Sequence, residues 1–172
     1  EEKTKEVIDS EGWFHTGDIG CFVDGDFLKI TDRKKEIFKT SGGKYIAPQQ
    51  MENKYKESRF IEQIMVIGEN QKHPSALIVP AFAFIEEWCK QKEINVSSNT
   101  EIANNDKVID RINKELEGFN SQFGKWEQVK KFELIDHEWT VDTEELTPTM
   151  KLKRKVIMTK YDHLVKKIYG EV

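Results

Sequence analysis

Apolar residues recur along the chain at two spacings, one typical of helices and one typical of strands. Helical spacing predicts four helices, at residues 48–58, 82–92, 106–119 and 154–169. Short apolar runs bounded by turn residues predict three strands, at residues 61–67, 76–79 and 132–135. The clearest helix is 106–119, because Val108, Ile112 and Leu116 fall on one face. Pro48 suits the first turn of the helix that it begins.

Glycines divide the N-terminal part of the chain into short segments. Asp24-Gly25 lies between two apolar runs and predicts the two-residue turn of a β-hairpin at residues 20–30. The polar stretch 95–105 predicts a loop, and the acidic stretch 140–148 predicts turns. Helices and hairpins together predict an α+β fold, with a small antiparallel sheet and packed helices that follow the short hairpin.

The composition is that of a folded domain with an uneven charge distribution. Of the 172 residues, 37% are hydrophobic, and their regular clustering argues against disorder. No apolar run approaches the roughly 18 residues that a membrane-spanning helix needs. The formal net charge of −4 hides two basic clusters: residues 29–44 carry six basic and two acidic side chains, and residues 151–167 carry seven and one. Residues 1–26 carry eight acidic and two basic side chains.

Cysteine and histidine spacing predicts no metal site. Cys21 and Cys89 form no CxxC pair, and the four histidines show no ligand spacing. Two isolated thiols are typical of a reducing compartment, so we expect a cytoplasmic location.

The first residues indicate a piece of a longer protein. The sequence has no initiator Met, and it opens in a polar, helix-like stretch without the apolar region of a signal peptide. Its first apolar pair, Val7-Ile8, has nothing before it to pack against. We therefore expect a cut at Glu1.

The first segment with candidate chemistry is GWFHTGDIG, residues 12–20, in which Asp18 lies between glycines. A carboxylate held there can accept hydrogen bonds from a cis-diol such as ribose, each worth about 1.5–3 kcal/mol. A turn Asp that bonds the local backbone is the commoner role for such a residue. The segment alone leaves both interpretations open.

Two further segments combine basic residues with turn residues. In TDRKKEIFKTSGGK, residues 31–44, Arg33 can bind phosphate and Gly42-Gly43 permit close backbone approach, although the P-loop spacing is absent. In LTPTMKLKR, residues 146–154, a proline-stiffened loop presents Lys151, a cation that can neutralise charge at a phosphoryl or carboxyl centre. Each segment alone also fits a solvated basic surface.

Taken together, in this order and spacing, the three segments resemble the adenylate-forming enzymes. This superfamily includes acyl-CoA synthetases, luciferase and the adenylation domains of peptide synthetases. The form TPTMK is most similar to long-chain fatty acid–CoA ligases. Such enzymes have a large N-terminal domain and a small mobile C-terminal domain. The resemblance therefore implies that residues 1–34 end the large domain and residues 35–172 form the mobile domain.

The resemblance also implies a role for each candidate residue. Asp18 and Arg33 would bind the ribose of ATP, and Lys35 would be the hinge between the domains. Lys39, Gly42 and Gly43 would serve the thioester step.

Lys151 would contact the carboxylate and the α-phosphate during adenylation. ATP and a fatty acid would form an acyl-adenylate and pyrophosphate, and coenzyme A would then take the acyl group and release AMP. Mg²⁺ is implied with ATP, and no nucleic acid partner is implied.

Some points stay open at the level of sequence. The family loop after Lys39 often has a single glycine, so the resemblance assigns no coenzyme A contact to Lys44 or Tyr45. Peripheral contact with a membrane is compatible with the sequence but is not indicated by it. Because the regions for the triphosphate and the acyl chain lie elsewhere in such enzymes, we expect the isolated piece to be inactive.

Two alternatives remain beside the long-chain ligase. The first is another adenylate-forming enzyme that uses a different carboxylic acid or acceptor. The second is a non-enzymatic module that binds nucleic acid or an anionic membrane through the basic clusters. The acidic segments 1–26 and 133–146 argue against a broad basic face.

Overall fold

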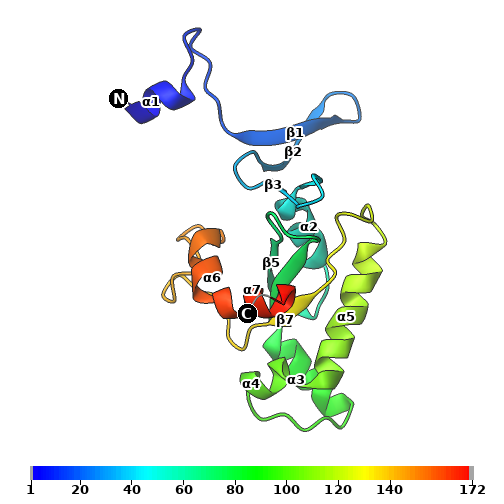
Figure 1. Cartoon of the computed structure of the whole chain (residues 1–172). Helices are drawn as coiled ribbons and strands as arrows, with labels where there is room; N and C mark the ends of the chain where they lie inside the picture. Colours follow the sequence, from blue (N-terminus) through cyan, green and yellow to red (C-terminus); the bar gives the residue numbers. More distant parts are fainter. Residues whose placement is uncertain (1, 171–172) are drawn as a thin grey trace.

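The computed structural model describes residues 2–170, so Glu1, the expected cut, lies outside the described part. Helix α1 (Glu2–Val7) and a β-hairpin extend from one end of the molecule (Figure 1). The remaining elements gather around a three-stranded sheet, which gives the α+β fold that the sequence predicts.

The predicted hairpin is present and is longer than expected. Strands β1 (Asp18–Val23) and β2 (Phe27–Arg33) pair antiparallel. The turn has three residues rather than two, because Val23 pairs with Phe27 and residues 24–26 lie between them. Gly25 has a φ of 85°, a conformation that glycine adopts without steric cost.

The three-stranded sheet forms the centre of the body. Strands β5 (Ile61–Ile67) and β6 (Ser75–Pro80) pair antiparallel, as the sequence predicts. Strand β7 (Phe132–Leu134) lies next to β6 but runs parallel to it, so the sheet is mixed rather than purely antiparallel. The reason is the long connection after β6, which contains three helices and returns the chain to the same end of the sheet.

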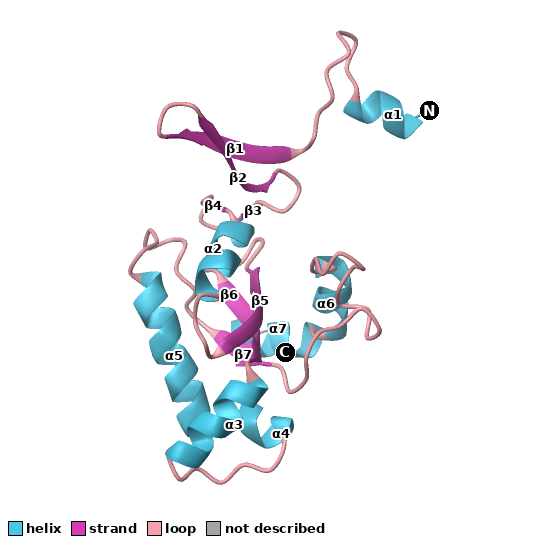
Figure 2. Ribbon diagram, turned by 180° about the vertical axis from the view of Figure 1, so that it is seen from behind, coloured by secondary structure: helices cyan, strands magenta, loops and turns pink. Residues whose placement is uncertain are grey.

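Helices enclose the sheet on both sides. Helix α2 (Pro48–Tyr55) packs on β5, and α7 (Asp162–Tyr169) packs on β7. Helices α3 (Phe82–Gln91) and α5 (Asp106–Asn120) complete the connection from β6 to β7. Figures 1 and 2 place α5 and α6 (Arg154–Lys160) on opposite sides of the sheet. Every residue of β6 is buried because this strand is central in the sheet.

Two helix predictions need correction. The predicted loop at 95–105 contains helix α4 (Asn99–Ala103), in which Ser98 Oγ accepts the Glu101 N–H and caps the first turn. The predicted helix 154–169 is two helices, α6 and α7, which break at Tyr161. The break allows α6 and α7 to take different directions while the buried Tyr161 stays in the core.

The hydrophobic core lies within the body and runs from Ile46 to Ile168. Its largest fully buried side chains include Trp139 and Tyr55. In α5, the three residues predicted to share one face, Val108, Ile112 and Leu116, are buried. Within the described residues, no helix has the length and apolar character that crossing a membrane would require.

The hairpin differs from the body because its apolar side chains are exposed. Phe22 is 73% exposed and Phe27 is 68% exposed, and Trp13, before β1, is 71% exposed. Short strands β3 (Phe38–Lys39) and β4 (Tyr45–Ile46) follow the hairpin and lead into the body.

Candidate functional site

The strand register brings Asp18 and Arg33 together. They are paired residues at the open end of the β1–β2 hairpin, and Arg33 Nε lies 3.1 Å from Asp18 Oδ1. Both side chains remain accessible, Asp18 at 28% and Arg33 at 51%. The Asp18 N–H donates to Thr16 Oγ1, which fixes the backbone just before the strand. A carboxylate and a guanidinium are thus available side by side at one exposed edge.

Asp32, the residue before Arg33 in β2, has a different role that the sequence pattern does not indicate. Its side chain is fully buried and accepts the Arg33 N–H at 2.6 Å and the Gln49 N–H at 3.1 Å. Gln49 lies in the first turn of α2, where backbone N–H groups lack helical partners. Burial raises the pKa of Asp32, although the two N–H donors oppose the rise. Asp32 therefore ties the hairpin to the start of α2.

Lys35 lies in the tight turn between β2 and β3. The Glu36 and Ile37 N–H groups both donate to the Arg33 carbonyl, at 2.9 and 3.2 Å. Lys35 itself is exposed. A short exposed turn is a place where a few backbone dihedrals can change without disturbing a core.

Lys39, Gly42 and Gly43 belong to the β3–β4 hairpin. Thr40 organises its turn, because the Thr40 N–H donates to the Lys44 carbonyl and the Gly43 N–H donates to the Thr40 carbonyl, both at 2.9 Å. Gly43 has a φ of 78°, which favours glycine, whereas a Cβ at Gly42 would make only an ordinary contact with Thr40 Oγ1, at 3.9 Å. The turn is exposed and can approach another surface through its backbone.

Lys151 lies in a compact loop directly before α6. The Lys151 N–H donates to Thr147 Oγ1 at 3.1 Å, and its carbonyl accepts the Thr147 N–H at 2.8 Å. An isolated bridge between Leu146 and Leu152 closes the base of the loop. Among the residues that the structure describes, the Lys151 ammonium group has no ion-pair partner, and the side chain is exposed. The loop therefore holds the backbone and leaves the cation available.

A small cavity connects this loop to the hairpin. It has a volume of about 200 Å³, and Arg33, Glu36 and Lys151 all contribute to its lining. Gly42 and Gly43 do not line it; their turn lies against the β5–β6 connection, where the Ser41 N–H donates to the Gln71 carbonyl. The structure thus brings Lys151 and Arg33 to one cavity and places the glycine turn elsewhere.

Glu145 anchors the loop of Lys151 from inside the protein. Its side chain is fully buried, and Oε1 accepts hydrogen bonds from Lys160 Nζ at 2.5 Å and from the Tyr161 hydroxyl at 3.0 Å. Burial would raise the pKa of Glu145, but the bond from Lys160 leads the contributions that lower the pKa to about 2. The Glu145 carbonyl also accepts the Lys153 N–H at 2.7 Å.

Arg154 anchors the other end of the same loop. Its Nη2 lies 2.6 and 2.7 Å from the two carboxylate oxygens of Glu52, and its Nε lies 3.2 Å from Glu36 Oε2. Burial raises the pKa of Glu52 to about 7, although Arg154 and the Val66 N–H oppose the rise. The sequence analysis assigned no role to these residues.

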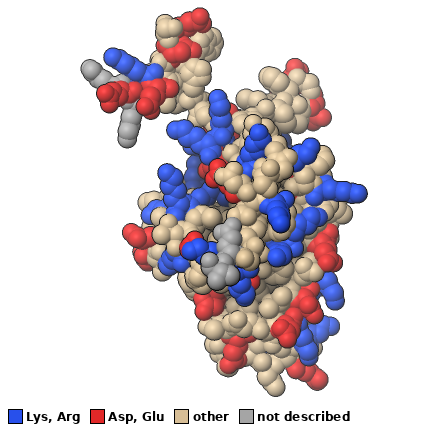
Figure 3. Space-filling view, in the orientation of Figure 1, with Lys and Arg blue, Asp and Glu red and all other residues tan. Residues whose placement is uncertain are grey.

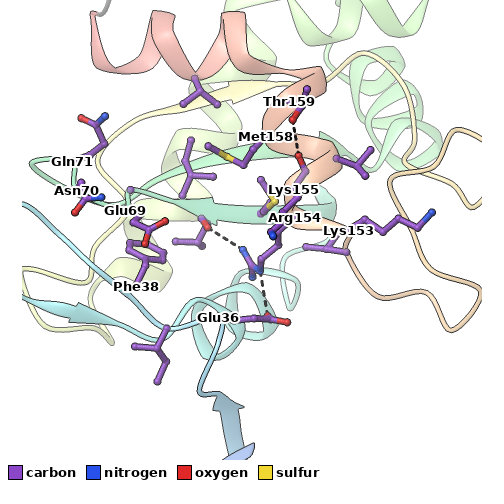
Figure 4. Close-up of a pocket in the computed structure, with 18 of the residues that line it drawn as sticks. Glu36, Phe38, Glu69, Asn70, Gln71, Lys153, Arg154, Lys155, Met158 and Thr159 are labelled. Atoms are coloured by element: carbon purple, nitrogen blue, oxygen red, sulfur yellow. Dashed lines mark hydrogen bonds and ion pairs between the residues drawn. The ribbon is translucent and has the colours of Figure 1, made fainter. Parts of the chain in front are cut away.

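A groove with a volume of about 950 Å³ lies beside Arg154, between α6 and the segment that follows Lys35 (Figure 4). Lysine and arginine side chains gather across the middle of the face in Figure 3, whereas its lower part carries both signs of charge. Among the described residues, no group of three or more His, Cys, Asp or Glu side chains could hold a metal ion.

Comparison with known proteins identifies the family of the chain. Residues 35–172 match the family described as "AMP-binding enzyme C-terminal domain". The chain is 34% identical over 175 residues to the peroxisomal long chain acyl-CoA synthetase 7 of Arabidopsis thaliana, and 36% identical over 173 residues to human long-chain-fatty-acid–CoA ligase 1. It is also 34% identical over 172 residues to the long-chain-fatty-acid–CoA ligase FadD15 of Mycobacterium tuberculosis. These alignments include 99–100% of the chain but only 25–28% of each relative.

Solved structures share the fold. The adenylation domain of a carboxylate reductase from Mycobacterium chelonae superposes with a TM-score of 0.81 at 24% identity, covering 98% of this chain and 25% of that one. The corresponding domain from Segniliparus rugosus, in complex with AMP and a co-purified carboxylic acid, also gives a TM-score of 0.81, at 21% identity, covering 99% of this chain and 25% of that one.

Proposed function

Because the chain belongs to the family of AMP-binding enzyme C-terminal domains, we propose that it forms the C-terminal part of an ATP-dependent long-chain fatty acid–CoA ligase. The full-length enzyme would be an acid–thiol ligase with two half-reactions. In the first, the fatty acid carboxylate attacks the α-phosphorus of ATP and displaces pyrophosphate. In the second, the coenzyme A thiol attacks the acyl-adenylate carbonyl and displaces AMP.

The division of the chain is part of the proposal. Residues 1–34 would complete a larger N-terminal domain, and residues 35–172 would be the mobile domain. The exposed apolar side chains of the hairpin, such as Phe22 and Phe27, support this division. Soluble proteins rarely expose large apolar patches to solvent, and the larger domain would cover these side chains. The chain spans about a quarter of the length of its curated relatives, which leaves the acyl pocket to the larger domain.

The observation that carries the proposal is the shared lining of one cavity by Arg33 and Lys151. Arg33 is paired with Asp18, so a ribose bound at the hairpin would lie on the side of the domain from which Lys151 projects. Asp18 would accept hydrogen bonds from the ribose hydroxyls, and Arg33 would hold that carboxylate in place and also contact the ribose.

Lys151 would act on the first half-reaction. Adenylation brings a carboxylate towards a phosphate and develops further negative charge on the phosphoryl oxygens. An ammonium group that is already positioned lowers this barrier, and removing such a group typically costs about 10²–10³ in rate. The second half-reaction starts from the finished adenylate, so it should need Lys151 much less.

The second half-reaction would use another surface of the same domain. Rotation about Lys35 would withdraw the Lys151 loop and bring the turn of Lys39, Gly42 and Gly43 to the site. The separate positions of these two loops support such an exchange. Mg²⁺ would arrive bound to ATP, as part of the substrate. A cytoplasmic location is part of the proposal, and the two free cysteines support a reducing compartment.

The test separates the two half-reactions in the full-length enzyme. Lys151→Ala should reduce fatty-acid-dependent ATP–pyrophosphate exchange by about 10²–10³. The same variant should convert a supplied fatty acyl-adenylate to the thioester at close to the wild-type rate. Lys155→Ala is the matched control, because it removes an exposed lysine one turn further along, on α6, and should leave both rates unchanged.

Equal loss of both half-reactions in Lys151→Ala would contradict the assigned role. A panel of carboxylic acids in the exchange assay tests the substrate class: preference for a short or aromatic acid would favour another adenylate-forming enzyme. The 172-residue chain alone should support no exchange, since the larger domain is needed to hold ATP and the acid.

A further inference from the structure

One guanidinium group joins three elements beneath the groove shown in Figure 4. Arg154, the first residue of α6, donates from Nε to Glu36, from Nη1 to the Val66 carbonyl at 3.2 Å, and from Nη2 to Glu52. Glu36 directly follows Lys35, Val66 lies in β5, and Glu52 lies in α2. We call Glu36, Glu52 and Arg154 the arginine clamp.

The clamp is rigid on the side of the domain core. Glu52 is only 7% exposed, and its Oε1 accepts the Val66 N–H at 2.8 Å as well as the bond from Arg154. Arg154 therefore binds the same β5 residue both directly and through Glu52. A planar guanidinium with several donors held in this way has little freedom to shift.

The clamp is also close to Lys151 along the chain. Arg154 is three positions after Lys151, with two residues between them, so at most about 11 Å of extended backbone lies between their Cα atoms. The other end of the loop is held by Glu145, whose carbonyl accepts the Lys153 N–H. A shift at the start of α6 would consequently move Lys151.

Glu36 connects this arrangement to the turn of Lys35. Its side chain is 35% exposed and makes one contact with Arg154, at 3.2 Å. The contact joins two residues that are 118 positions apart in the chain: the one that follows Lys35 in the turn and the one that begins α6.

We propose that Glu36 is a positioning residue for the adenylation half-reaction: through Arg154 it makes the turn at Lys35 and the Lys151 loop move as one rigid body. This inference rests on the proposed function, because it gives the rotation about Lys35 a mechanical link to the group it must deliver. A misplacement of about 1 Å at a reacting group can cost as much as 10²-fold in rate. The link matters little for thioester formation, in which Lys151 is dispensable.

The experiment uses Glu36→Gln in the full-length enzyme. Arg154 keeps its bonds to Glu52 and to the Val66 carbonyl when Glu36 changes, so the variant should fold normally. We expect kcat for adenylation to fall about tenfold, with KM for ATP and fatty acid unchanged, and thioester formation from supplied adenylate to stay within twofold. Glu36→Lys places a cation against Arg154 and should lower adenylation about a hundredfold.

The control and the kinetic split separate positioning from other effects. Glu57→Gln removes a carboxylate that pairs with Lys54 at 2.7 Å on the surface, and it should change neither half-reaction. If Glu36 acted only through its charge, its removal would strengthen the binding of anionic ATP and lower KM without lowering kcat. That outcome, or an equal loss of both half-reactions, would overturn the inference.

A second readout does not depend on catalysis. Hydrogen exchange should show the Met150, Lys151 and Lys153 amides of the loop exchanging about tenfold faster in Glu36→Gln, with the amides of α5 unchanged. Unchanged loop amides would overturn the inference even if adenylation fell. If the wild-type enzyme formed no adenylate while the loop amides responded, the positioning contact would stand and the proposed reaction would fail.

Discussion

Replacing Arg154 by methionine tests how the clamp stabilises the fold. The substitution keeps much of the apolar side-chain volume but removes the bonds to Glu52, Glu36 and the Val66 carbonyl. Glu52, at 7% exposure, would then lie buried without a cation. Breaking a buried pair in this way typically costs about 3–5 kcal/mol. This is a large part of the roughly 5–15 kcal/mol that stabilises a typical domain.

The loss should also depend on pH, and the direction follows from Glu52. Burial raises its pKa from 4.5 to about 7 in the wild type, so the stability that the neutral form supplies is present below pH 4.5 and is lost as the pH rises to about 7. Without Arg154 the folded pKa is higher still. The variant should therefore keep losing about 1.4 kcal/mol per pH unit above pH 7, where the wild-type curve is flat.

Urea unfolding of the 172-residue chain at pH 5, 7 and 9 measures these differences. Trp139 is 1% exposed and should report unfolding through its fluorescence. The double variant Arg154→Met with Glu52→Gln leaves no charge at either position of this pair, so the loss above pH 7 should disappear. Arg59→Met is the control, because exposed Arg59 only stacks over Phe84 and its removal should cost less than about 1 kcal/mol.

Two results would refute this reasoning. The first is a loss below about 1 kcal/mol for Arg154→Met at pH 7, which would mean that Glu52 finds adequate solvation without its partner. The second is a double variant that keeps the steep pH dependence above pH 7, which would assign that dependence to another group.

Further substitutions test the role of Glu145 and the difference in burial between α5 and the β1–β2 hairpin. Burial would raise the pKa of Glu145, but hydrogen bonds led by the one from Lys160 outweigh it and lower the pKa from 4.5 to about 2, so the stability that ionised Glu145 contributes is full above pH 4.5 and is lost as the pH falls towards 2. In acid unfolding, Glu145→Gln should remove about 1–2 kcal/mol of this loss of stability, a modest value because Lys160 is 41% exposed and solvent screens the pair. An unchanged acid profile would contradict the assignment. Ile112→Ala, in the buried face of α5, should cost about 2–5 kcal/mol in urea unfolding, whereas Phe22→Ser on the exposed hairpin should cost less than about 0.5 kcal/mol; similar costs would contradict the burial that separates the two positions.

The elements predicted well from sequence are those whose signal is local. The face of Val108, Ile112 and Leu116 defines α5, and the apolar runs define β5 and β6. Helix α4 was missed although its signal was present: Ser98 and Glu101 have the S-x-x-E spacing of a capping box. Ser98 Oγ accepts the Glu101 N–H, and the Glu101 carboxylate accepts the N–H of Ser97, one residue before the cap, at 2.7 Å. A polar composition concealed a helix start.

Other features could not be predicted because their causes are not local. The parallel direction of β7 depends on the path of the three-helix connection that leads to it. The residues of β7 itself, Phe132–Leu134, do not determine this direction. The break between α6 and α7 at Tyr161 could not be predicted, because residues 154–169 contain no glycine or proline. That residue instead satisfies its buried hydroxyl through Glu145, sixteen positions away in the chain.

The predicted site residues were found through motifs, whereas the buried charges near them needed the structure. The strand register brings Asp18 and Arg33 together, and their roles stay proposals. Glu52 had a signal that could have been used, because it lies on the helix face of Met51 and Tyr55, and a carboxylate on a buried face requires a partner. The partner, Arg154, is 102 positions away and could not be identified from spacing.

The placement of these buried charges agrees with the role proposed for Lys151. In that role Lys151 would reach a substrate held by another domain, so neither its ammonium group nor its loop would be buried in this one. Precision must then come from the two ends of the loop, and each end is held by a buried carboxylate with a basic partner: Glu145 with Lys160, and Glu52 with Arg154. Apolar packing alone would tolerate small shifts, whereas bonds of fixed length and direction to buried charges tolerate few. A variant at either anchor should therefore affect adenylation through position before it affects the chemistry of Lys151 itself.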